Sequence, residues 1–150
     1  MDTSKNEIQA INSLIEINND RIQGYRTAEE ETEHADLKSI FGSNLRQSQQ
    51  FNSELGQKVR MLGGEPTEGT TLSGKAYRAW MDVKAALSGK DRKAILSSCE
   101  FGEDAALSAY RTVVEGNDLS ADSRIIIQKQ HAELQKAHDQ MKSLRDQQIA

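Results

Sequence analysis

Four side chains in the second half of the chain are the best candidates for binding a metal ion. Glu100 and Glu103 are three residues apart, and His131 and His138 are seven residues apart, so each pair shares one face of a helix. Carboxylate and imidazole groups together suit iron or zinc. A non-standard metal site built from Glu100, Glu103, His131 and His138 is therefore one hypothesis for this protein.

A complete di-iron centre of the kind held inside helical bundles is not predicted. Such a centre needs one glutamate from each of two helices and Glu-x-x-His from each of the other two. The amphipathic segment 36–62 contains no histidine, and glutamine replaces the glutamate before both His131 and His138. A neutral amide lacks the charge that binds the metal. The one literal match, Glu31-x-x-His34, lies in an acidic stretch that we expect to be a turn.

The same residue types also have a structural interpretation, which we favour. His131 and His138 are expected to be partly buried or surface histidines that hydrogen-bond to neighbouring helices. Glu103 lies on or near an apolar helix face, where a carboxylate usually pairs with Arg, Lys or His across the helices. Cys99 is the only cysteine, so it cannot form an internal disulfide, and we expect a small buried thiol.

No complete catalytic motif is present in the chain. It contains no glycine-rich phosphate loop, no Gly-x-Ser-x-Gly elbow, no zinc-protease motif and no Cys-x-x-Cys pair. Basic residues between Lys129 and Arg145 alternate with acidic ones, which is typical of a solvated helix face and not of a nucleic-acid-binding stripe. We leave open whether the protein is an enzyme and favour a non-enzymatic role without a cofactor.

The elements that position these residues are predicted to be helices. Apolar residues recur with helical spacing over four long segments and one shorter segment. The long segments run from about Lys5 to Glu30, Asp36 to Leu62, Arg92 to Glu115 and Ser120 to near the C-terminus, and the shorter one from about Leu72 to Leu87. Asp36 is a candidate N-cap, and Gly63-Gly64 followed by Pro66 is predicted to end the second segment.

The short helix determines the expected topology. Two antiparallel neighbours need only a few loop residues, but here a helix of roughly 24 Å lies between the second and third long helices. Such a connection returns the chain along its own length and makes those two helices parallel. The predicted fold is therefore all-α, a ferritin-like four-helix bundle with an extra short crossover helix between the second and third long helices. The alternative is up-down-up-down order with the short helix packed against one end.

Particular residues on the apolar faces predict specific contacts. Asn18 lies on the stripe of the first helix and needs a polar partner. Gly24 is costly inside a helix, so close packing of a neighbour is expected there. Trp80, with Tyr77, is expected to dock the crossover helix; the alternative is an exposed anchor for a partner.

Length and composition suggest one domain over residues 1–150. The net charge is −4 and 36% of the residues are hydrophobic, which suits one core and argues against binding nucleic acid. No apolar run approaches the roughly 20 residues of a membrane span. Because residues 1–8 have no apolar signal region, we expect a cytoplasmic protein.

Several motifs distributed over nearly the whole chain match a known pattern. They are Asp20-x-x-x-Gly24-Tyr25 with Ala28; Leu62-Gly63-Gly64-x-Pro66; Ala79-Trp80-Met81 with Lys84-Ala85; Cys99-Glu100-x-Gly102-Glu103-Asp104-Ala105-Ala106-Leu107 with Tyr110; and Ala137-His138-Asp139 with Leu144-Arg145-Asp146. By these motifs the chain resembles a bacterial family of ferritin-like four-helix-bundle proteins of unknown function. The resemblance implies the fold but no reaction. It also suggests that its polar members form an interhelical network: Asp20, Tyr25, Glu100, Glu103, Tyr110, His138, Arg145 and Asp146.

Two functions follow from the sequence. The first is a non-enzymatic helical bundle that acts by association, as a homodimer or with a protein partner, in a stress-linked role. The second is a divergent metal-binding ferritin-like protein that holds iron or zinc at an incomplete or non-standard site. Neither involves nucleic acid or a membrane.

Overall fold

The regular structure of the chain is helical. The computed structural model describes residues 2–71 and 74–148, and no strand occurs among them. The five helices are α1 (Asp2–Glu31), α2 (Ala35–Met61), α3 (Lys75–Gly89), α4 (Arg92–Glu115) and α5 (Ala121–Asp146). The all-α prediction is confirmed. None of the helices in the described part of the chain is both long enough and apolar enough to cross a membrane.

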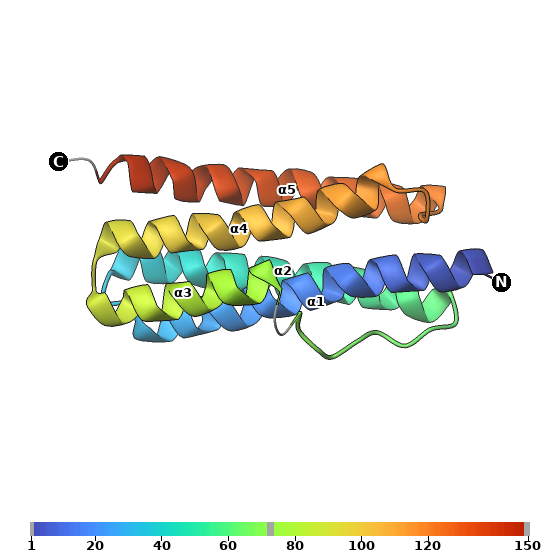
Figure 1. Ribbon diagram of the computed structural model, residues 1–150, viewed down its shortest axis with the longest axis horizontal. Helices are drawn as coiled ribbons and strands as arrows, with labels where there is room; N and C mark the ends of the chain where they lie inside the picture. The colour runs from blue at the N-terminus through green and yellow to red at the C-terminus, as the bar shows by residue number, and fades with distance from the viewer. Residues whose placement is uncertain (1, 72–73, 149–150) are drawn as a thin grey trace.

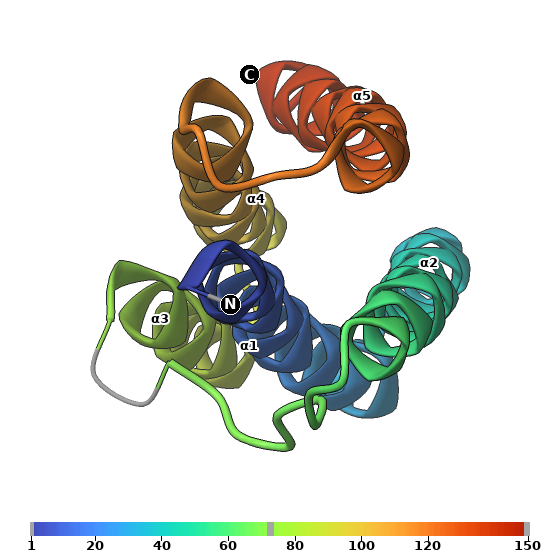
Figure 2. The ribbon, with the colours of Figure 1, turned by 90° about the vertical axis from the view of Figure 1, so that its right-hand side faces the viewer.

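Four long helices lie lengthwise beside one another, with the shorter α3 along one side (Figure 1). In Figure 1, α2 and α4 run in one direction, whereas α1, α3 and α5 run in the other. The end-on view in Figure 2 places α1 between α2 and α3, with α4 and α5 above them. The chain therefore returns along its length through α3 before α4 begins, which makes α2 and α4 parallel.

The helix ends follow from local chemistry. At the end of α2, Gly63 adopts a left-handed φ of 88°. The Gly64 N–H donates to the Val59 carbonyl at 2.9 Å and the Gly63 N–H to the Arg60 carbonyl at 3.0 Å, which together form a Schellman motif. Asp91 caps α4, because its side chain accepts hydrogen bonds from the backbone of the first turn.

Three sequence expectations about helix ends need correction. His34, not Asp36, occupies the N-cap of α2 and makes no side-chain capping bond. Asp36 lies in the first turn, where its carboxylate accepts from Arg92 at 2.6 and 3.0 Å. The acidic stretch remains helical up to Glu31. The short helix begins at Lys75, and Leu72 lies outside the described residues.

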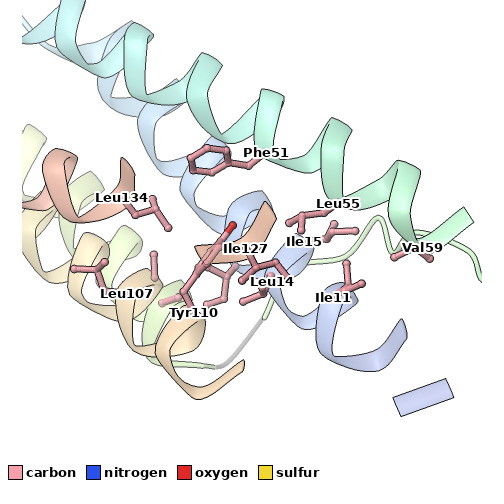
Figure 3. Close-up of a cluster of buried hydrophobic side chains, with 13 residues drawn as sticks. Ile11, Leu14, Ile15, Phe51, Leu55, Val59, Leu107, Tyr110, Ile127 and Leu134 are labelled. Atoms are coloured by element: carbon pink, nitrogen blue, oxygen red, sulfur yellow. The ribbon is translucent and has the colours of Figure 1, made fainter. Parts of the chain in front are cut away.

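Apolar side chains form two buried clusters along the helices. Figure 3 shows the first, which combines Leu14 and Ile15 of α1 with Phe51 and Leu55 of α2, Leu107 and Tyr110 of α4, and Ile127 and Leu134 of α5. The second contains Tyr25, Phe41 and the Trp80, Val83 and Leu87 side chains of α3. Each fully buried large apolar side chain contributes about 1.5–3 kcal/mol to stability. Between the clusters lie buried polar residues, which are described below.

Trp80 docks α3 onto α1 and α4, as expected. Its side chain is buried and lies against two glycines. A Cβ atom on Gly24 would be 2.3 Å from Trp80 Cε3, and one on Gly102 would be 2.6 Å from Trp80 Cζ2. Both helices therefore need glycine where the indole packs, which explains why α1 tolerates Gly24 in its interior.

Candidate functional site

A buried ion pair lies between the two apolar clusters. Arg21 of α1 donates from Nε to Glu103 Oε1 at 2.6 Å and from Nη2 to Glu103 Oε2 at 2.9 Å. Both side chains are fully buried. This two-point geometry satisfies both carboxylate oxygens and is the strongest form of arginine–carboxylate contact. The interpretation of Glu103 as a carboxylate paired across the helices is confirmed.

The remaining donor of Arg21 connects the ion pair to α2. Arg21 Nη1 donates to Ser48 Oγ at 2.8 Å and to the Asn44 carbonyl oxygen at 3.3 Å. Ser48 Oγ then donates to Asn18 Oδ1 at 2.8 Å. Asn18 therefore has the polar partner that its place on the apolar stripe requires.

From Asn18 the hydrogen bonds continue to α5. Asn18 Nδ2 donates to Tyr110 Oη at 2.8 Å, and Tyr110 Oη donates to Gln130 Oε1 at 2.7 Å. Gln130 Nε2 donates to Glu54 Oε1 at 2.9 Å. One hydrogen-bonded network thus joins α1, α2, α4 and α5, and we call these residues with Arg21, Ser48 and Glu103 the central network.

The Arg21–Glu103 ion pair affects the pKa values of buried groups around it. Burial opposes the charge of Arg21, but the Glu103 carboxylate outweighs it and keeps the pKa of Arg21 above its ordinary value. Burial, reinforced by the charge of Glu103, raises the pKa of the Cys99 thiol far above its usual range. Because the thiolate is the reactive form, burial of Cys99 disfavours reactions at its sulfur. It is a buried thiol, as expected.

The central network does not fit a di-iron centre, which ferritin-like folds hold at this level between the helices. A guanidinium already supplies the positive charge there, and both Glu103 oxygens are bound to it. Glu54 is the second carboxylate in the network, and it accepts from the Gln130 amide. No histidine nitrogen takes part in the hydrogen bonds just described.

A second cluster lies nearer the surface, between α4 and α5. Glu100 and Asp104 are one helical turn apart on α4, and His138 faces them from α5. One potential ligand atom from each residue lies within 4.8 Å of the other two. His138 Nε2 is 2.7 Å from Asp104 Oδ1. We call Glu100, Asp104 and His138 the surface cluster.

Further charged groups surround the surface cluster. His138 Nδ1 lies 3.1 Å from Asp139 Oδ1, which also accepts from Gln135 Nε2 at 3.0 Å. The hydrogen bond from His138, with a smaller one from Gln135, lowers the pKa of Asp139. On the opposite side, Arg145 Nη1 donates to Glu100 Oε1. All three residues of the cluster therefore already have polar partners, and Asp104 is the one most exposed to solvent.

The four metal-ligand candidates from the sequence separate into three places. Glu100 and His138 belong to the surface cluster, whereas Glu103 belongs to the central network. His131 lies elsewhere on α5, with its ring 6.5 Å from the Tyr110 ring centroid. The structure therefore does not bring these four side chains together at one place.

The polar residues suggested by the resemblance also do not form one network. Asp20 accepts a hydrogen bond from Thr71, while burial raises the pKa of Asp20. Arg145 pairs with Glu100 and Asp146, away from Arg21. Sequence reasoning missed Asp104, although its spacing of four residues from Glu100 was a usable signal.

Comparison with known proteins places the chain in a family. A family model described as "Domain of unknown function (DUF2383)" matches residues 6–116. The chain belongs to this family. The matched residues extend from α1 to just beyond α4, so Glu100 and Asp104 lie inside the match and His138 lies outside it. No curated protein matches the chain.

Proposed function

We propose that this DUF2383 protein is a ferritin-like four-helix bundle that binds one divalent metal ion at its surface cluster. The observation that carries the proposal is the convergence of Glu100, Asp104 and His138 from two helices, with ligand atoms within 4.8 Å. The direction of the helices supports the ferritin-like part. The crossover through α3 and the parallel α2 and α4 match that topology (Figure 1).

The spacing of the surface cluster is close to that of a metal site. Ligand atoms around one zinc ion lie roughly 3.3 Å apart, because each zinc–ligand distance is about 2 Å. The ligand atoms of the cluster, which lie within 4.8 Å of one another, would have to approach by at most about 1.5 Å to reach this spacing. Asp104 is 53% exposed, so it has the freedom to rotate.

The surroundings of His138 favour metal binding through its Nε2 atom. Metal-binding histidines commonly donate their other ring N–H to a carboxylate, which fixes the tautomer and strengthens the ligand. Asp139 occupies that position at Nδ1, and Gln135 holds Asp139 in place. Nε2 lies 2.7 Å from Asp104 Oδ1, so a proton is shared between these two atoms in the structure. A divalent cation would replace that proton and bind both Nε2 and the Asp104 carboxylate.

The mixture of one imidazole and two carboxylates selects the metal. It suits zinc or ferrous iron better than magnesium or calcium, which prefer oxygen ligands alone. Three protein ligands leave one coordination position for water or a further group. We assign zinc as the first metal to test because it is stable in air.

The proposal is tested with the purified full chain after dialysis against a chelator. Isothermal titration with Zn²⁺ should show one site, and zinc at one hundred times Kd should raise the free energy of unfolding by about 2.7 kcal/mol. His138→Gln and Asp104→Asn should abolish binding. His34→Gln should retain it, because His34 lies at the start of α2, outside the surface cluster. The absence of a stoichiometric site, or unchanged binding by His138→Gln, would overturn the proposal.

One observation favours association as a second function. The Phe101 side chain on α4 is 69% exposed, and large exposed aromatic residues are enriched where proteins meet. A homodimer or a protein partner would cover it. Light scattering after size-exclusion chromatography should show a dimer for the wild type and a monomer for Phe101→Ser. A monomeric wild-type protein would exclude the homodimer.

A further inference from the structure

Arg145 occupies one of the proposed metal ligands. Its Nη1 atom donates to Glu100 Oε1, and its Nε and Nη2 atoms donate to Asp146 Oδ1 at 3.1 and 2.9 Å. We infer that Arg145 is a built-in competitor for the metal, so that binding of a divalent cation at the surface cluster releases Arg145 from Glu100 and frees the last turn of α5. This inference rests on the proposed metal site.

Helix geometry allows Arg145 to reach the cluster. It follows His138 by seven residues, which places both side chains on the same face of α5. The Arg145 side chain is 27% exposed and that of Glu100 is 12% exposed. The contact is therefore shielded on the Glu100 side and open to solvent on the Arg145 side, so the guanidinium can leave without unpacking the core.

Charge makes a bound cation and Arg145 compete for Glu100. Arg145 is held by negative charge from Asp146, Glu100 and Asp104. A divalent cation bound to Glu100 and Asp104 would cancel the attraction from those two carboxylates, leave Arg145 with Asp146, and add repulsion between two positive groups only a few ångströms apart. Asp139 and Lys142 also carry charge near the cluster, and the charge of Lys142 acts on Asp139.

Release of Arg145 would change the end of α5. Within residues 2–71 and 74–148, the Arg145–Glu100 contact is the ion pair that joins the last turn of α5 to α4. Leu144 also packs there, but only as a partly buried side chain. Loss of the ion pair should therefore loosen the backbone from Ser143 to Gln148, where few other contacts hold it.

The test compares Arg145→Gln with Lys142→Gln, which removes a positive charge from the same end of α5. Zinc titration at fixed pH and ionic strength should give a Kd roughly tenfold lower for Arg145→Gln, because no charge-assisted hydrogen bond has to be broken. Lys142→Gln should change Kd by less than about threefold, as a screened surface charge does. Equal affinities for Arg145→Gln and the wild type would overturn the competition.

Hydrogen exchange provides a readout that separates competition from a simple change in charge. Zinc should accelerate amide exchange in residues 143–148 of the wild type and slow it or leave it unchanged around His138. In Arg145→Gln the same residues should exchange quickly with or without zinc. If neither protein binds zinc, the proposed function and this inference both fail. If both bind it and exchange in residues 143–148 does not respond, only the inference fails.

Discussion

Removal of the Glu103 carboxylate tests the central network most directly. Glu103→Ala would leave the fully buried guanidinium of Arg21 with only Ser48 and the Asn44 carbonyl as acceptors. Breaking a buried ion pair by removing one partner typically costs about 3–5 kcal/mol, because the remaining charge stays out of water without compensation. That cost is a large fraction of the roughly 5–15 kcal/mol stability of a typical domain.

Two companion variants separate the ion pair from side-chain size. Glu103→Gln keeps the volume but places an amide N–H₂ against one Arg21 donor, so it should cost less than Glu103→Ala and still destabilise. The double variant Arg21→Met with Glu103→Leu replaces both charges by apolar groups of similar size. It should recover most of the loss, since such replacements are often neutral.

The assay is equilibrium unfolding in urea, followed by helical circular dichroism. The free energy of unfolding should fall for Glu103→Ala at an unchanged slope with denaturant. Glu115→Ala, at the exposed end of α4, is the matched control and should stay within about 0.5 kcal/mol of the wild type. Equal stabilities of the Glu103→Ala and Glu115→Ala variants, or a double variant no better than Glu103→Ala, would refute the reasoning.

Two further predictions concern packing and pH. Gly24→Ala should destabilise by about 1–3 kcal/mol, because its Cβ would lie 2.3 Å from Trp80. A Cβ atom on Gly89 would meet nothing within 4 Å, so Gly89→Ala should stabilise by up to about 1 kcal/mol in the same urea unfolding assay. Equal effects of the two substitutions would contradict the packing of Trp80 on Gly24. Hydrogen bonding to Arg92 lowers the pKa of Asp36 to about 2, so the stability from this pair should persist above pH 4 and disappear as the pH falls through 2. This contribution is the difference in the free energy of unfolding between the wild type and Asp36→Asn, measured from pH 2 to 6. A difference that does not shrink as the pH approaches 2 would contradict the prediction.

Much of the helical architecture could be predicted from the sequence because its signals are local. Helical spacing of apolar residues placed α4 at its observed bounds, and Gly63 correctly marked the end of α2. The prediction that Asp36 is the N-cap of α2 was wrong, because an acidic residue near a helix start can equally well form an ion pair. Its partner, Arg92, is distant in sequence and becomes visible only in three dimensions.

The candidate sites were harder to predict because they depend on pairs from different helices. The sequence showed that Glu103 needed a cationic partner, but several basic residues could have provided it, and Arg21 was not singled out. Likewise, Glu100 and His138 were candidates, yet periodicity on each helix cannot show which of His131 and His138 faces Glu100. That choice depends on the rotation of α5 against α4.

The polar layer across the middle of the helices constrains how they align. If one helix shifted along its neighbours by a single turn, roughly 5.4 Å, Arg21 and Glu103 would separate. At least one of these charged side chains would then lie unpaired among apolar residues. The apolar side chains on either side of this layer are less selective, because each can pack against a different apolar neighbour at little cost. We therefore expect the polar layer to specify a single register of the helices. The apolar clusters on either side stabilise the bundle but do not select that register.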